Sequence, residues 1–337
     1  MLKLNTLSYS LSLEYPFTIS RYTVTTQQIV IVSISNGTHT GYGEATANPY
    51  YGSSVEKITA SVESVKALVE NSEELLPGQF WNKLEPHLKE DYFALCALDC
   101  AFWDLYARIN DRPLRTFFCS SEEQSPLSNY TIGIDEVEVM QSKIIENPWP
   151  IYKIKLGTED DLAIVRALRS VTDSVFRIDA NCAWSVDQTL EYAPELKNLD
   201  VEFIEQPLPA DKWDDMRYLK DRCELPLIAD ESCKRFDDIK LCANSFDGIN
   251  IKLMKCGGLS PALRMIDTAR NYGLKVMAGC MTESTIGISN LVQIAPLLDS
   301  IDADGALLLK KDIASGVKLV DGRIKFSEKP GSGTSLF

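Results

Sequence analysis

Histidine is scarce in this chain of 337 residues, which contains only His39 and His87. Neither residue stands near a carboxylate-rich end of a strand-like run. A catalytic triad built on histidine, or a zinc site with several imidazole ligands, therefore has too few candidate residues. Acid–base chemistry in this protein would have to rely on other titratable side chains.

Basic side chains, paired cysteines and long apolar segments are also scarce. The chain has 34 basic and 48 acidic side chains, a net charge of −14, which argues against nucleic acid or an anionic membrane as a partner. Its nine cysteines are odd in number and form no Cys-x-x-Cys motif, so we expect buried thiols in a reducing cytoplasm. No apolar stretch is long enough to span a bilayer, and residues 1–6 do not resemble the start of a signal peptide.

The order of predicted strands and helices divides the chain into two parts. In the first third, the β-branched run 28–34 precedes Asn36-Gly37, a strong hairpin signal, and residues 94–109 are apolar nearly all round, as in a buried helix. Strands followed by helices predict an α+β domain, which we place at 1–120. We place a second domain at 121–309 and expect residues 310–337 to return to the first.

From about residue 129 the pattern changes to strand, helix, strand. Eight strand-like runs recur at intervals of roughly 22–28 residues, from Thr131 to Ile301-Asp302-Ala303-Asp304. Such alternation predicts a parallel sheet, and eight units close as an α/β barrel. The alternative is an open doubly wound sheet, which would bring a glycine-rich phosphate loop after the first strand. The sequence has no such loop there.

Five of these runs end in a charged residue, namely Lys155, Asp179, Glu205, Asp230 and Lys252, at successive steps of 24, 26, 25 and 22 residues. Strand ends of a parallel barrel converge at one mouth, so these side chains should meet there. Asp179, Glu205 and Asp230 would supply the hard oxygen ligands that suit Mg²⁺. The alternative is that each acid caps the helix that follows it, which explains single positions better than a regular repeat.

Lysines are the candidate acid–base groups. Lys153 and Lys155 alternate along one strand and so share a face, where Lys153, a nearby cation and partial burial would lower the pKa of Lys155. Lys252 ends the sixth strand, across the mouth from the second. Two lysines on opposite sides of a bound carboxylate could remove a proton from one face of a carbon and deliver one to the other. The alternative is a pair of solvated lysines at strand ends.

Longer motifs surround these positions: Lys153-Ile154-Lys155, Asp179-Ala180-Asn181, Glu205-Gln206-Pro207, Asp230-Glu231-Ser232, Asn250-Ile251-Lys252 and Gly257-Gly258, with Glu283. With them the chain resembles the muconate-lactonising subgroup of the enolase superfamily, over nearly its whole length. The resemblance implies a modified TIM barrel, (β/α)7β, with an N-terminal α+β capping domain. It also implies one Mg²⁺ per subunit, held by the three carboxylates, and the lysine pair Lys155 and Lys252 as catalysts, assisted by Lys153.

Within this subgroup the last barrel strand separates the activities. Asp302 and Asp304 resemble the Asp-x-Asp with which dipeptide epimerases hold the free α-ammonium of a substrate, and two carboxylates on one face make a suitable clamp. Thr131 and Cys280, on other barrel strands or near their ends, complete the expected substrate-binding set. Arg21 stands where epimerases of this type hold a distal carboxylate. The resemblance therefore implies a small dipeptide, L-Ala-D/L-Glu, as the substrate, inverted at its second residue.

Other activities stay open on the sequence alone. Cycloisomerases and o-succinylbenzoate synthases share the fold, but their substrates carry no amine for Asp302 and Asp304 to bind. A metal-independent Schiff-base lyase would use one strand-end lysine and would not need three carboxylates. A protein without catalytic activity would not need the five charged strand ends. The oligomeric state does not follow from the sequence, which is compatible with a homo-oligomer.

Overall fold

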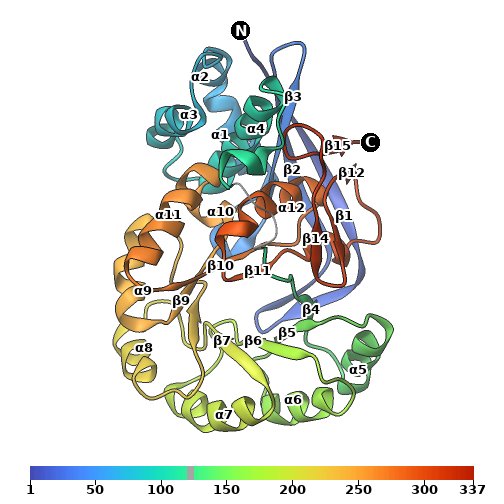
Figure 1. Ribbon diagram of the computed structural model, residues 1–337, viewed down its shortest axis with the longest axis vertical. Helices are drawn as coiled ribbons and strands as arrows, with labels where there is room; N and C mark the ends of the chain where they lie inside the picture. The colour runs from blue at the N-terminus through green and yellow to red at the C-terminus, as the bar shows by residue number, and fades with distance from the viewer. Residues whose placement is uncertain (120–124) are drawn as a thin grey trace.

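The computed structural model describes residues 1–119 and 125–337. An antiparallel sheet with helices packed against it lies at the top of Figure 1, and a ring of parallel strands surrounded by helices lies below it. The two parts correspond to the α+β domain and the barrel expected from the sequence. The predicted boundary between residues 120 and 121 lies outside the described residues.

The N-terminal domain is a three-stranded antiparallel sheet in the order β1-β2-β3, with four α-helices. The turn between β2 and β3 is the predicted hairpin, where the Asn36 amide donates to the His39 carbonyl at 3.2 Å and Gly37 has a φ of 93°. The elements are β1 (Lys3–Ile19), β2 (Tyr22–Ser35), β3 (Thr40–Thr46), α1 (Val55–Ser64), α2 (Lys66–Glu70), α3 (Pro77–Leu84) and α4 (Tyr92–Ile109).

Helix α4 is the core of this domain, because most of its side chains are buried on every face. Asp91 caps its first turn by accepting from the Ala94 amide at 3.1 Å. The helix touches β3 almost backbone to backbone, since a Cβ atom at Gly43 would lie 2.0 Å from the Ala97 carbonyl oxygen. In the described part of the chain, no helix has both the length and the hydropathy needed to cross a membrane.

The barrel strands run in sequence order from β4 to β11 in one eight-stranded sheet, with parallel pairing between neighbours. A parallel bridge between Ser128 and Ile301 brings the last strand back to the segment before the first, so the barrel is nearly closed. This confirms the predicted barrel over the open doubly wound sheet. The strands are β4 (Tyr130–Ile132), β5 (Ile151–Lys155), β6 (Val175–Asp179), β7 (Val201–Glu205), β8 (Leu227–Ala229), β9 (Gly248–Ile251), β10 (Lys275–Gly279) and β11 (Ser300–Asp302).

Helices follow the barrel strands and cover the ring from outside, as Figure 1 shows for α5 to α9 and α11. Their apolar faces pack on buried strand residues such as Ile154, Ile178 and Ile204. The helices are α5 (Val137–Glu146), α6 (Asp161–Arg169), α7 (Val186–Asn198), α8 (Trp213–Lys220), α9 (Ile239–Ser245), α10 (Leu253–Cys256), α11 (Leu259–Asn271) and α12 (Thr285–Leu291).

The C-terminal segment packs against the N-terminal domain. Arg108 on α4 donates to the Thr334 carbonyl at 2.8 Å, and Asp104 accepts from the Ser332 amide at 2.6 Å. The segment contains β12 (Ala314–Ser315), β13 (Lys318–Val320), β14 (Arg323–Lys325) and β15 (Ser335–Leu336). The tail thus contacts the first domain, while the limits 1–120, 121–309 and 310–337 stay predictions.

The fold brings the tip of the β1–β2 hairpin to the mouth of the barrel. Figure 1 shows this long hairpin reaching down toward β4 and β5. The Ile134 amide donates to the Thr18 carbonyl at 2.9 Å, and the Arg21 side chain donates to the Asn181 carbonyl at 2.8 Å. Residues from both domains therefore share one site at the carboxyl ends of the strands.

Candidate active site

Three carboxylates meet at the mouth of the barrel. Asp179 ends β6, Glu205 ends β7 in register with it, and Asp230 directly follows β8. All three are buried, and one oxygen from each lies within 4.8 Å of the others. Lys155 on β5 is also in register with Asp179. The regular spacing in the sequence thus corresponds to a real cluster, because parallel strands end at the same edge.

Four ammonium groups surround the carboxylates. Lys155 Nζ lies 2.6 Å from Asp179 Oδ2, and Lys252 Nζ lies 2.8 Å from Asp230 Oδ2. Lys255, which the sequence reasoning missed, lies on α10 and contacts Asp230 Oδ1 at 2.5 Å. Its only signal in the sequence is a second lysine three residues after Lys252, a spacing that is common on any helix.

Lys153, the fourth of these lysines, lies deep in the cluster. Its side chain is 1 % exposed, and its ammonium group is within 3.1 Å of Asp179, 2.8 Å of Glu205 and 3.0 Å of Asp302. Burial opposes its charge, but these carboxylates, Asp302 first, raise the pKa of Lys153 well above its ordinary value. The geometry is that of a counter-ion beneath the cluster, and its predicted part in proton transfer stays a prediction.

The carboxylate cluster fits a divalent cation. Glu205 Oε2 is buried and accepts no hydrogen bond, although the Lys153 ammonium lies 2.8 Å away, so this contact is one of charge without donor alignment. Burial and then the charge of Asp179 raise the pKa of Glu205 to about 7. Burial acts in the same direction at Asp179, but Lys155 and Lys153 lower the pKa of that carboxyl to about 2. Asp179, Glu205 and Asp230 are therefore the residues that would hold Mg²⁺.

A cavity of about 90 Å³ opens above this cluster. Barrel residues, including Lys155 and Lys252, line its floor, and residues of the capping domain, including Ile19, Arg21 and Tyr50, line its other side. Burial opposes the charge of Lys252, but Asp230 raises the pKa of this lysine above its ordinary value. Both predicted acid–base lysines thus reach the same cavity from strands on opposite sides of the barrel.

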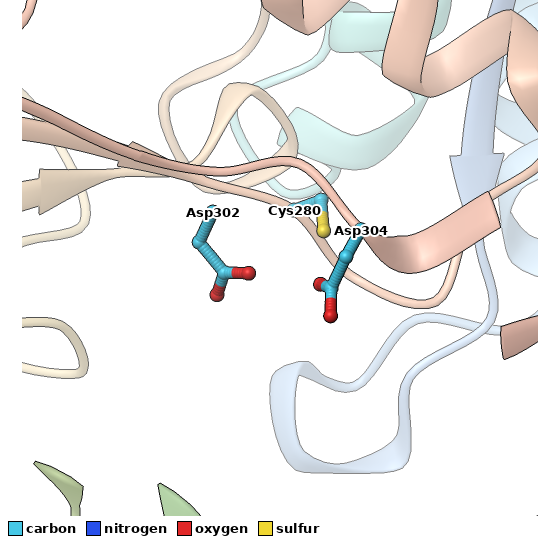
Figure 2. Close-up of side chains that lie close together, drawn as sticks. All are labelled: Cys280, Asp302 and Asp304. Atoms are coloured by element: carbon cyan, nitrogen blue, oxygen red, sulfur yellow. The ribbon is translucent and has the colours of Figure 1, made fainter. Parts of the chain in front are cut away.

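Asp302, Asp304 and Cys280 form a second group on the wall of the cavity. Figure 2 shows the two carboxylates and the thiol pointing the same way from the chain, and one atom from each lies within 4.8 Å of the others. Asp304 accepts from the Thr131 amide at 2.5 Å. The four residues predicted to bind substrate in the barrel are therefore together.

The pKa values of Asp302 and Asp304 are shifted in opposite directions. Burial and then the charge of Asp302 raise the pKa of Asp304 well above its usual range. Burial also opposes ionisation of Asp302, but Lys153 lowers the pKa of that carboxyl. Asp302 is fixed by hydrogen bonds from Lys153 Nζ at 3.0 Å and from Asn129 Nδ2 at 2.8 Å. Hydrogen bonds therefore hold both carboxyl groups in place, and each carboxyl group affects the pKa of the other.

Arg21 lines the cavity but has partners of its own. Its guanidinium contacts Glu231 Oε1 at 2.7 Å and the Asn181 carbonyl at 2.8 Å, and it lies 4.3 Å from the centre of the Tyr50 ring. Glu231 is 1 % exposed and Arg21 is 26 % exposed, so the guanidinium closes over a buried acid. Glu231 and Tyr50 were not predicted as site residues, because their contacts form only when the two domains meet.

Comparison with known proteins agrees with this geometry. Residues 1–118 match the family described as "Mandelate racemase / muconate lactonizing enzyme, N-terminal domain". Residues 136–336 match the "Enolase C-terminal domain-like" family. The chain belongs to the enolase superfamily. This confirms the resemblance seen in the sequence motifs and the modified TIM barrel with its capping domain.

Several curated relatives match almost the whole chain, among them two that are about half identical to it. An L-Ala-D/L-amino acid epimerase from Flavobacterium johnsoniae is 48 % identical, over 99 % of this chain and 100 % of its own. One from a Maribacter species is 50 % identical, over 97 % of each chain. A solved dipeptide epimerase from Enterococcus faecalis, complexed with Mg and L-Leu-L-Tyr, has a TM-score of 0.93 and 27 % identity over 99 % of both chains.

Proposed function

We propose that the protein is a Mg²⁺-dependent dipeptide epimerase that inverts the α-carbon of the second residue. One observation carries this proposal: Lys155 and Lys252 reach a single cavity from opposite sides, each in contact with a different outer carboxylate of one cluster. The relatives named above are epimerases, which supports an isomerase that acts on amino acid derivatives.

The lysines move the proton in this proposal. One lysine removes the α-proton from one face, and the other delivers a proton to the opposite face, which inverts the carbon. The two roles exchange when the reaction runs backwards. Removal of the proton builds a second negative charge on the substrate carboxylate, and a cation bound by Asp179, Glu205 and Asp230 would neutralise part of it. Lys153 balances part of the negative charge of Glu205 and Asp302 beneath the cavity.

Asp302 and Asp304 bind the substrate's free amino group in this proposal. Both line the cavity, and their carboxylates point the same way in Figure 2. A substrate ammonium placed between them would make charge-assisted hydrogen bonds. Cycloisomerases and o-succinylbenzoate synthases act on substrates that have no such amine, so this pair favours a dipeptide over those alternatives.

The identity of the second residue is the finer part of the proposal. We predict L-Ala-D/L-Glu, with Arg21 contacting the distal carboxylate at the edge of the cavity. Arg21 would have to share its guanidinium with Glu231, which it contacts at 2.7 Å. The two relatives at 48 % and 50 % identity are named for L-Ala followed by an amino acid that is not specified. That name supports alanine in the first position and is compatible with several second residues.

The free thiols of the protein bear on the cellular compartment in which it works. Cys280 is a free thiol that lines the cavity, and Cys182 is a second free thiol. Free thiols suit a reducing compartment, so we propose the cytoplasm.

Exchange of the substrate α-proton in D₂O tests the function. A library of L-Ala-X dipeptides should exchange the proton of residue X, with inversion, in the presence of Mg²⁺. Treatment with EDTA should abolish exchange, and added Mg²⁺ should restore it. Full turnover in metal-stripped protein would contradict the Mg²⁺ requirement, and borohydride trapping of an aldehyde or ketone substrate on one lysine would favour a Schiff-base lyase instead.

A further inference from the structure

The inner face of helix α4 packs against the segment that follows Lys252. This segment contains the short helix α10, then Gly257 and Gly258, then the start of α11. Lys252 stands immediately before α10, so anything that fixes this segment also fixes the backbone of one of the two lysines. The contacts come from the capping domain, although the lysine belongs to the barrel.

Asp99 on α4 makes the central contact. Its carboxylate is fully buried and accepts from the Ser260 amide at 2.8 Å and from the Ser260 hydroxyl at 2.7 Å. The Trp103 indole donates to the same hydroxyl at 2.9 Å, and the Trp81 indole donates to the Gly257 carbonyl at 2.9 Å. Three side chains of one domain thus hold two residues of the other, Gly257 and Ser260, which are three positions apart.

The glycines make this approach possible. Gly257 and Gly258 have φ values of 94° and 120°, a region that other residues rarely occupy. A Cβ atom at Gly258 would lie 2.4 Å from Asp99 Oδ2, and one at Gly257 would lie 2.9 Å from Tyr92 Cδ1. The carboxylate therefore sits directly against the backbone, with no side chain between them.

The other end of α10 is tied to Lys252 and to the carboxylate cluster. The Lys255 and Cys256 amides donate to the Lys252 carbonyl at 2.9 and 3.2 Å. The Lys255 ammonium contacts the Asn250 carbonyl at 3.1 Å and Asp230 Oδ1 at 2.5 Å. Only four residues, 253–256, separate Lys252 from Gly257, which Trp81 holds, and Asp99 holds Ser260 three residues further along the chain. A shift at the glycines therefore passes along α10 to Lys252.

We infer that Asp99 is a positioning residue for Lys252, and that the capping domain sets the geometry of one of the two lysines through it. The inference rests on the proposed epimerase function. Lys155 is on β5, whose position depends on β4 and β6. Loss of Asp99 should therefore impair the epimer that Lys252 deprotonates and spare the epimer that Lys155 deprotonates. A general loss of stability would impair both.

The experiment measures α-proton exchange in D₂O from each epimer of one L-Ala-X dipeptide separately. Lys252→Ala first identifies the epimer that depends on Lys252. Asp99→Ala should then slow exchange of that epimer by about 10- to 100-fold, as a misplacement of about 1 Å does, with a change of less than about three-fold for the other. Asp99→Asn should recover part of the rate, because its amide oxygen can still accept from the Ser260 amide.

Asp104→Ala is the matched control, because Asp104 is also fully buried on α4 but accepts from Tyr42 and Ser332 instead of the α11 segment. It should lower stability without an asymmetry between epimers. If Asp99→Ala does not fold, Ser260→Ala removes one of the two hydrogen bonds and should give a smaller asymmetry of the same sign. Equal slowing of both epimers by these variants would overturn the inference. If wild-type protein exchanges the α-proton of neither epimer, the proposed function would be overturned instead.

Discussion

Replacement of Lys153 by methionine would test whether this lysine is the counter-ion of the carboxylate cluster. The ammonium lies within 3.1 Å of Asp179, Glu205 and Asp302, and every one of these groups is buried. Methionine has a similar length and no charge, so the variant keeps most of the packing and removes only the ammonium. Three carboxylates would then lose a common partner in a site that excludes most water.

Removal of one partner from a buried ion pair typically costs about 3–5 kcal/mol, because the remaining charge stays buried without compensation. We expect Lys153→Met to lower the free energy of unfolding by about this amount, measured by urea denaturation without divalent cations. Lys197→Met is the control, since Lys197 pairs with Glu224 at 3.3 Å with both side chains about half exposed. Such surface pairs contribute about 0–1 kcal/mol.

Added Mg²⁺ should stabilise the Lys153→Met protein more than the wild type, because a cation would replace part of the missing charge. A ligand at 100 times its Kd stabilises a folded protein by about 2.7 kcal/mol, so the difference should be measurable in the same assay. If Lys153→Met is no less stable than Lys197→Met, the counter-ion role is wrong. If Mg²⁺ stabilises the wild type and the Lys153→Met protein equally, Lys153 does not share its carboxylates with the cation.

Three further predictions concern the cavity and its surroundings. Asp304→Asn should raise the KM of free dipeptides about ten-fold more than that of N-acetylated ones, because a charge-assisted hydrogen bond to the ammonium is lost; equal effects would remove the clamp. Arg21→Ala should lower kcat/KM for L-Ala-D/L-Glu by about ten-fold and leave L-Ala-L-Ala nearly unchanged, and a dipeptide library led by apolar second residues would argue against glutamate. Burial and then Glu44 raise the pKa of Glu283 from 4.5 to about 8. The folded protein therefore keeps a proton that the unfolded chain loses, and this contribution to stability falls as the pH rises from about 4.5 to about 8. Glu283→Gln should flatten that fall in urea titrations over this pH range, and an unchanged slope would show that Glu283 is not its source.

The barrel and its carboxylates could be predicted because both depend on local sequence and a fixed period. A charged residue at the end of an apolar run needs no knowledge of its neighbours, and parallel strands bring such ends together at one edge. Asp179 and Glu205 pair in register in the structure for this reason. The same reasoning gave Lys155 and Lys252 as residues on opposite sides of the mouth.

Contacts between the domains could not be predicted, because the residues that form them are not related by any regular spacing in the sequence. Asp99 stands in an apolar helix and has no partner that the sequence pattern indicates, yet in the structure it is fully buried against Ser260. Arg21 was expected to face the substrate, and its contact with Glu231 depends on how far the hairpin reaches over the barrel. The depth of Lys153 is also a packing result, since alternation gives its face but not its partners.

Each outer aspartate of the cluster contacts one of the two lysines that we propose as bases. Asp179 contacts Lys155 at 2.6 Å, and Asp230 contacts Lys252 at 2.8 Å. Glu205, between them, is held by Lys153 at 2.8 Å and by Asn250 at 2.8 Å. In the proposed epimerisation each lysine acts as the base for one epimer, so both must reach the substrate carbon. Each of them contacts one aspartate of the cluster, but the second partner of that aspartate differs, because Asp179 also contacts Lys153 and Asp230 also contacts Lys255.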